Sequence, residues 1–151
     1  MNHQRYQELI RETCEAVGLP DTRAIVERGA LEVEGYEIQL LNYETDPSAI
    51  YMNFVFGVVP AGRSLAIWRM MLEANLSVYA QDQAHLGMDA DTGSVLLIVR
   101  LVMVQNVDGQ HLAEVISHYV EHGRYWKNTI LNTNDEMFEG VCSGDYRWIK
   151  G

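Results

Sequence analysis

The chain has 151 residues, of which 48% are hydrophobic, and a formal net charge of −10 at pH 7. This length and composition fit one globular domain and exclude a disordered or collagen-like chain. Because nucleic-acid binders use Lys and Arg to displace phosphate counterions, the excess of 21 acidic over 11 basic residues argues against a nucleic acid or an anionic membrane as partner.

The beginning of the chain shows no targeting signal. Residues 1–6 lack the apolar stretch of a signal peptide, and no run of about 18 apolar residues is present that could cross a membrane. The two cysteines, Cys14 and Cys142, are too few for a disulfide-stapled scaffold. We therefore expect a soluble, acidic protein of the cytoplasm with two reduced, unreactive thiols, and a single disulfide between them is the alternative.

The N-terminal half predicts a helix followed by strands. Apolar residues at helical spacing run from Tyr6 to Val17, where Gly18 and Pro20 end the helix, and residues 21–28 predict a further short helical turn. From Leu31 the apolar residues alternate with polar ones, which predicts two strands interrupted at Gly35. A turn at residues 45–48 leads into a second alternating run over residues 50–58, the expected hairpin partner.

The C-terminal half predicts helix, hairpin and helix. Residues 64–76 form the predicted middle helix, with Ser64 as N-cap and Asn75 near its end. A loop ending at Gly93 joins two predicted strands, a short one over residues 86–88 and an apolar one over residues 95–104. The second strand is hydrophobic at nearly every position, which predicts that both of its faces are covered. Asp108 is the expected N-cap of a long last helix.

This order predicts an α+β fold with a mostly antiparallel, twisted sheet and helices packed on it, in the sequence α-β-β(-β)-α-β-β-α. No internal repeat or linker is present, so we place one domain in residues 1–131 and treat residues 132–151 as a C-terminal extension.

The middle helix carries more apolar surface than one sheet can cover. Leu65, Trp68 and Leu72 mark one side of it, and a second apolar side is formed by Ile67, Met70, Met71 and Ala74. Burial of a large apolar side chain contributes roughly 1.5–3 kcal/mol, so the side left in water would favour association. We expect a twofold homodimer, with a helix buried entirely within the monomer as the alternative.

One group of polar residues allows a different function. Glu114, His118 and His122 recur at four-residue intervals on the last helix, a spacing that could chelate a metal ion. The pattern lacks the HExxH signature and an evident fourth ligand, so a solvated polar face is the preferred interpretation. A metal-dependent enzyme or ligand sensor using these residues is the alternative; we otherwise expect neither an enzyme nor a cofactor.

The order of elements and several short motifs resemble the class I type III secretion chaperones, the Tir chaperone family. The resemblance covers roughly residues 6–131. The motifs that carry it are Met71-Leu72-Glu73-Ala74-Asn75-Leu76, Leu86-Gly87-Met88-Asp89, Thr92-Gly93, the apolar strand Val95-Leu96-Leu97-Ile98-Val99-Arg100-Leu101 and, near the end of the last helix, Trp126.

The resemblance implies a cytoplasmic bacterial homodimer without ATPase activity. Such a protein binds the N-terminal segment of a secreted effector, keeps it extended and delivers it to the secretion apparatus, with the secretion ATPase as a further candidate partner. The alternative is that this chain is a regulator, which uses the same fold to sequester a secretion-control protein. The implied dimer interface comprises Leu65, Trp68, Met71 and Leu72. The implied effector-binding residues lie on the alternating strands: Ile38, Leu40, Ile50, Met52, Phe54 and Phe56.

The C-terminal extension departs from the family pattern. It is longer than expected after the last helix and carries the apolar residues Met137, Phe138, Tyr146, Trp148 and Ile149. We expect this segment to fold back onto the domain or to cover a partner groove.

Overall fold

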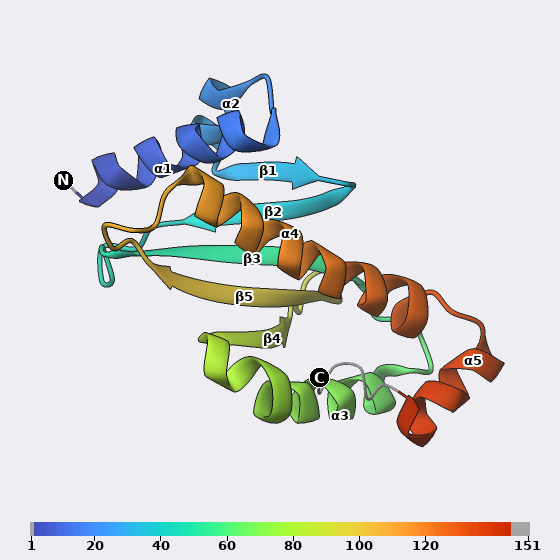
Figure 1. The fold of residues 1–151 in the computed structure, drawn as a ribbon. Coiled ribbons are helices and arrows are strands. Elements are labelled where there is room, and N and C mark those ends of the chain that lie inside the picture. The colour runs from blue at the N-terminus through green and yellow to red at the C-terminus, as the bar shows by residue number, and fades with distance from the viewer. Residues whose placement is uncertain (1, 146–151) are drawn as a thin grey trace.

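A five-stranded antiparallel sheet organises the chain (Figure 1). The computed structural model describes residues 2–145. In space the strand order is β1-β2-β3-β5-β4. All four neighbouring pairs are antiparallel, where a mostly antiparallel sheet was predicted. The strands are β1 (Ala30–Val33), β2 (Tyr36–Leu41), β3 (Ala49–Val58), β4 (Ala84–Met88) and β5 (Ser94–Val102).

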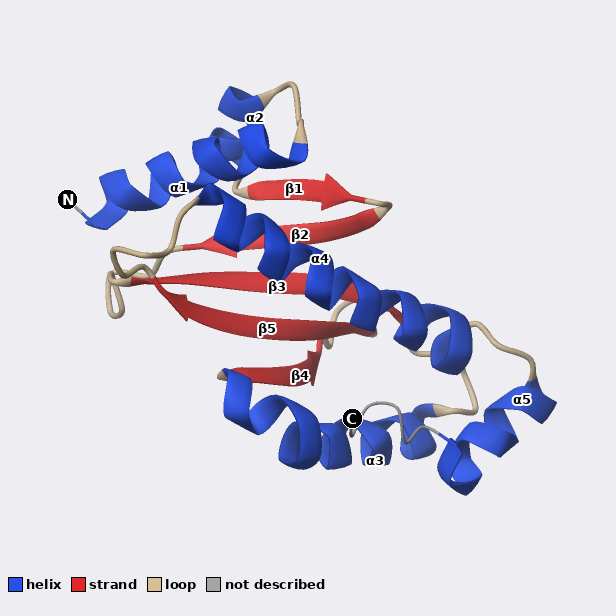
Figure 2. Cartoon of the chain, viewed as in Figure 1, coloured by secondary structure: helices blue, strands red, loops and turns tan. Residues whose placement is uncertain are grey.

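The helices gather on one face of the sheet and along one of its edges. Helices α1 and α4 lie across the same face, whereas α3 runs beside the edge strand β4 (Figure 2). The helices are α1 (Asn2–Val17), α2 (Thr22–Arg28), α3 (Ser64–Ala74), α4 (Gly109–Tyr125) and α5 (Asp135–Gly140). Within residues 2–145, no helix combines the length and hydrophobicity needed to cross a membrane.

The predicted α+β order is correct. The structure also contains the short helix α2 and, in the C-terminal extension, the helix α5. The short turn expected at residues 21–28 is α2, which Asp21 caps by accepting a hydrogen bond from the Ala24 amide. The last helix begins as predicted, since the Asp108 carboxylate accepts from the His111 amide.

The core lies between the sheet and the helices that cover it. Because successive side chains of a strand point to opposite faces, every second residue along a strand points to this face. There these side chains meet the apolar sides of α1 and α4. Trp126, which follows α4, is fully enclosed. The opposite face of β5 is only half-buried at Leu96 and Ile98, so the prediction that both faces of this strand are covered is wrong for the described part of this chain.

The middle helix starts and ends differently from the prediction. Ser64 is its first helical residue rather than its N-cap, and Arg63 precedes it without a capping side chain. Asn75 does not end the helical path, which continues through Asn75–Tyr79 and Ala80–Asp82. Instead, the Asn75 side chain accepts from the Leu86 amide (2.6 Å) and donates to the Leu86 carbonyl (3.2 Å). These two hydrogen bonds connect the edge strand β4 to the residue that follows α3.

Candidate functional site

The outer side of α3 is a continuous exposed apolar surface. Leu65, Trp68 and Leu72 are 74%, 43% and 69% exposed, and Leu76 in the next turn also faces outward. Met88 of β4 extends this surface, because the Trp68 indole nitrogen donates to the Met88 sulfur at 3.4 Å. We call these five residues the α3 stripe. These five side chains remain 41–83% exposed in the folded chain, so a partner that covered them would gain the free energy of burying this apolar surface.

The inner side of α3 belongs to the core. Ile67, Met70 and Ala74 are buried there, and so is Met71, at 6% exposure. Helical spacing correctly separated the two apolar sides of this helix and grouped Met71 with the inner one, whereas the resemblance implied that Met71 lies at the interface. Of the four residues predicted at a dimer interface, Leu65, Trp68 and Leu72 are accessible to a partner, and Met71 supports the helix from beneath.

The six predicted effector-binding residues are core residues in this structure. Each is at most 2% exposed, because α1 and α4 cover the face of the sheet that they occupy. Direct contact with an effector would require these helices to move away, so we reassign all six to the core: Ile38, Leu40, Ile50, Met52, Phe54 and Phe56.

The strand that carries four of these residues has no free edge. Strand β3 pairs with β2 on one side and β5 on the other. The outer strands are β1 and β4, and at β4 the side chain of Asn75 already bonds both backbone groups of Leu86. Strand β1 pairs only with β2 among the described strands, so its other edge is a second candidate for strand addition, although the Ala30 carbonyl of β1 already accepts from Arg28 at 3.4 Å.

The histidines of α4 join a packed cluster of rings. His122 Nδ1 lies 2.8 Å from the Tyr79 hydroxyl, and the rings of His118 and His122 are 4.9 Å apart. Glu114 interacts with Gln110 on its own helix. Among residues 2–145 no group of three His, Cys, Asp or Glu side chains is arranged to hold a metal ion. His122 is therefore engaged in packing between α4 and the turns after α3.

Burial of His122 predicts an acid-sensitive stability. Its pKa is lowered from 6.5 to about 4, first by burial and second by the nearby His118. Between pH 6.5 and 4 the unfolded chain therefore binds more protons at this residue than the folded chain, and stability falls as the pH falls. Urea unfolding at pH 7 and pH 5 should show a smaller loss for His122→Gln than for wild type. His85→Gln, at an exposed position on β4, is the control; equal losses in all three proteins would contradict the prediction.

The C-terminal segment returns to the start of α3, in agreement with the first form of our expectation. The Arg63 guanidinium donates to the carbonyls of Ile130 (2.9 Å) and Thr133 (2.6 Å), pairs with Asp135 (2.9 Å) and lies 4.4 Å above the Phe138 ring. Phe138 is buried. The predicted domain boundary at residue 131 stays a prediction, and Tyr146, Trp148 and Ile149 lie outside the described residues.

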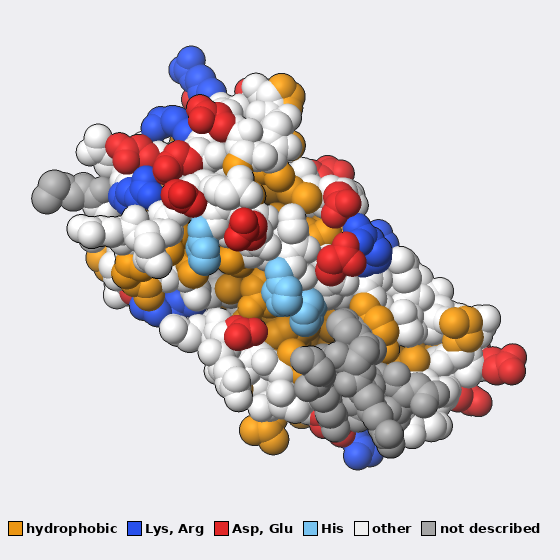
Figure 3. All heavy atoms as spheres, in the orientation of Figure 1, with side chains coloured by type: hydrophobic (Ala, Val, Ile, Leu, Met, Phe, Trp, Pro, Cys, Tyr) orange, Lys and Arg blue, Asp and Glu red, His pale blue; other side chains and the backbone are white. Residues whose placement is uncertain are grey.

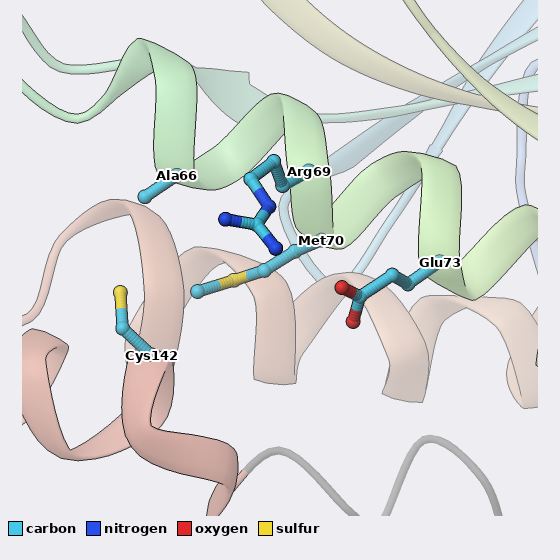
Figure 4. Close-up of a pocket in the computed structure, with 5 residues that line it drawn as sticks. All are labelled: Ala66, Arg69, Met70, Glu73 and Cys142. Atoms are coloured by element: carbon cyan, nitrogen blue, oxygen red, sulfur yellow. The ribbon is translucent and has the colours of Figure 1, made fainter.

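A small cavity of about 230 Å³ separates α3 from this segment. Figure 4 shows Arg69, Met70 and Glu73 extending from α3 into the gap, with Cys142 on the opposite side. Burial raises the pKa of the Cys142 thiol, which disfavours the reactive thiolate. The described part of the C-terminal segment, residues 132–145, thus lies beside α3.

Comparison with known proteins agrees with this architecture. The fold is similar to a chain of the ExsC-ExsE complex (TM-score 0.68, 18% identity, 87% of this chain and 98% of the other). It is also similar to a chain of the HopA1-SchA chaperone-effector complex (0.62, 12%, 83% and 94%) and to one of the ExoT-SpcS complex from Pseudomonas aeruginosa (0.54, 20%, 80% and 95%). These likenesses show a shared fold.

Family membership comes from the sequence itself. No curated protein sequence matches the chain. The profile of a family of chaperones, which is not a class of enzymes, matches residues 8–127 and so includes every element from α2 to α4. The chain belongs to the Tir chaperone protein (CesT) family.

Proposed function

We propose that this protein, a type III secretion chaperone by family and fold, acts in the bacterial cytoplasm as a homodimer. It would bind the N-terminal chaperone-binding segment of an effector and keep that segment extended for secretion. The observation that carries the dimer is the α3 stripe, which leaves Leu65, Trp68 and Leu72 in water on a helix whose other side is already buried. A twofold contact of α3 with its own copy would remove this surface from water.

An extended partner suits the remaining surface. A segment that is not folded alone loses conformational entropy on binding, so the chaperone must offer broad contact in compensation. Chaperone-effector complexes among the structural relatives support an effector as the partner. The outer edge of β1 and the hollows beside α4 are candidate surfaces for such a segment within the described residues.

Co-expression tests this function. The tagged chaperone is expressed with each effector encoded near its gene, as full-length protein and as an N-terminal segment alone. We expect one effector to co-purify through its N-terminal segment, with two chaperone chains per effector chain. Co-purification of a small secretion-control protein in place of an effector would favour the regulatory alternative. Failure of every effector to bind, or binding that requires a folded catalytic domain, would overturn the proposal.

A further inference from the structure

A groove with an apolar floor lies between α4, the end of β5 and the helical turn Ala80–Asp82. Val99 and Tyr119 form buried parts of its floor, and Leu101 and Val115 are half-buried within it. The Tyr119 hydroxyl donates to the Asp82 carboxylate at 3.3 Å and so connects the two walls. The volume of the groove, about 390 Å³, lies in the range of pockets that bind small ligands. Floor and walls are therefore formed before any partner arrives.

The rim of the groove is acidic. Asp82 lies on one wall and Glu114 on the other, both exposed, and the exposed His111 and His118 also line the groove on the α4 side. Arg100 is the one Lys or Arg among the described lining residues, and its guanidinium is already bound to Asp46 at 2.7 and 3.1 Å and to Gln83 at 2.8 Å. On this face, apolar and histidine side chains form a central band, with both acidic and basic side chains around it (Figure 3). Neither Asp82, which accepts from Tyr119, nor Glu114, which accepts from Gln110, is therefore paired with a Lys or Arg that lines the groove.

We propose that this groove binds an apolar side chain of the effector segment that is flanked by Lys or Arg. The inference rests on the proposed function and adds the chemistry of the bound segment. The floor takes the apolar side chain, and the two carboxylates on opposite walls attract a cation on each side of it. A second copy of this chain, with its net charge of −10, would bring charge of the same sign to the rim. Charge complementarity therefore selects a basic segment over a second copy.

Three synthetic peptides test the groove directly. Each contains the same central leucine in an eight-residue uncharged background, flanked on both sides by arginine, serine or glutamate. Titration of the isotope-labelled full chain, followed by NMR, should show the arginine peptide binding about tenfold more tightly than the serine peptide, as two exposed charge pairs predict. The largest amide shifts should fall on Leu101, Val115 and their neighbours. Equal affinities, or shifts centred on the α3 stripe, would overturn the proposal.

Charge-neutralising variants provide the second test. Asp82→Asn with Glu114→Gln keeps the size of both side chains and should reduce the preference for arginine over serine to about twofold or less. The matched control is Asp91→Asn with Glu136→Gln, which removes two exposed carboxylates outside the groove and should keep the full preference. An undiminished preference in the first double variant would contradict the assigned role of the rim.

The same variants separate this inference from the proposed function. If an effector co-purifies with wild type and equally well with the Asp82→Asn, Glu114→Gln variant, the groove assignment fails while the chaperone function stands. If no effector co-purifies but the peptide preference follows the rim carboxylates, the groove assignment stands while the chaperone function fails.

Discussion

Leu72→Asp is expected to convert the homodimer into a folded monomer. Leu72 lies at the middle of the α3 stripe and is 69% exposed, so the monomer can carry the aspartate in water. In a twofold interface the substitution occurs twice, and each copy removes an apolar contact worth roughly 1.5–3 kcal/mol and adds a carboxylate that must be desolvated. We expect the dissociation constant to rise at least about 100-fold. Sedimentation velocity over a concentration series, with circular dichroism to monitor folding, measures both effects.

Two matched variants make this result interpretable. Met71→Asp changes the neighbouring residue of the same helix, but Met71 is buried, so this variant should misfold or become insoluble. Val104→Asp adds the same charge at an exposed apolar residue outside α3 and should leave the dimer intact. A wild-type protein that sediments as a well-folded monomer would contradict the dimer proposal. A Leu72→Asp protein that remains a dimer would place the interface elsewhere.

The sheet could be predicted from the sequence because one chemical signal dominates it. Alternation from Leu31 to Val58 follows the pleat, so both strand identity and the buried face are encoded in consecutive residues. The turn residues do the same for the β4–β5 hairpin, where the Gly93 amide donates to the Asp89 carbonyl and Gly93 adopts a left-handed φ of 73°. These features are local, and so the sequence specifies them directly.

The candidate site was less predictable because accessibility depends on contacts between distant parts of the chain. Alternation shows that Ile50 and Phe54 share a face, but it does not show whether α4, more than 50 residues later, covers that face. The groove beside α4 was missed for this reason too, since Asp82, Leu101 and Glu114 come together only in the folded chain. Met71 differs, because helical spacing already groups it with the buried Ile67 and Met70, and only the resemblance placed it at the interface.

Asn75 illustrates how a tertiary contact overrides a local signal. Asn near a helix end favours a left-handed terminating residue, which is the basis of the sequence prediction. In the structure its side chain bonds both backbone groups of Leu86, and its own backbone stays helical at φ −59°. The gain is that both backbone groups of Leu86, on the edge strand β4, have their hydrogen bonds satisfied by a side chain just after α3. The left-handed residue occurs later, at Gln83.

Gly109→Ala is expected to destabilise the fold, although alanine is the better helix former. Helix propensity alone favours the variant by up to about 1 kcal/mol. However, a Cβ at Gly109 would lie 2.3 Å from the carbonyl carbon of Glu12 and 2.5 Å from its oxygen, so α4 would have to move away from the α1 backbone. This contact is held by Arg5, which bonds the Glu12 carboxylate and the Val107 carbonyl, each at 2.8 Å. Overpacking of this kind typically costs about 1–3 kcal/mol, and backbone atoms cannot turn aside as a side chain can.

The net loss should appear as a lower melting temperature, by roughly 2–4 °C for each kcal/mol in a chain of this length. Gln110→Ala is the matched control, because it adds alanine one residue later on the exposed side of α4 and should leave the melting temperature nearly unchanged. Gly123→Ala should have an intermediate effect, since its Cβ would meet the Phe56 ring at 2.9 Å rather than a backbone. An unchanged or higher melting temperature for Gly109→Ala would mean that helix propensity outweighs the contact, and that α1 and α4 separate more easily than their packing indicates.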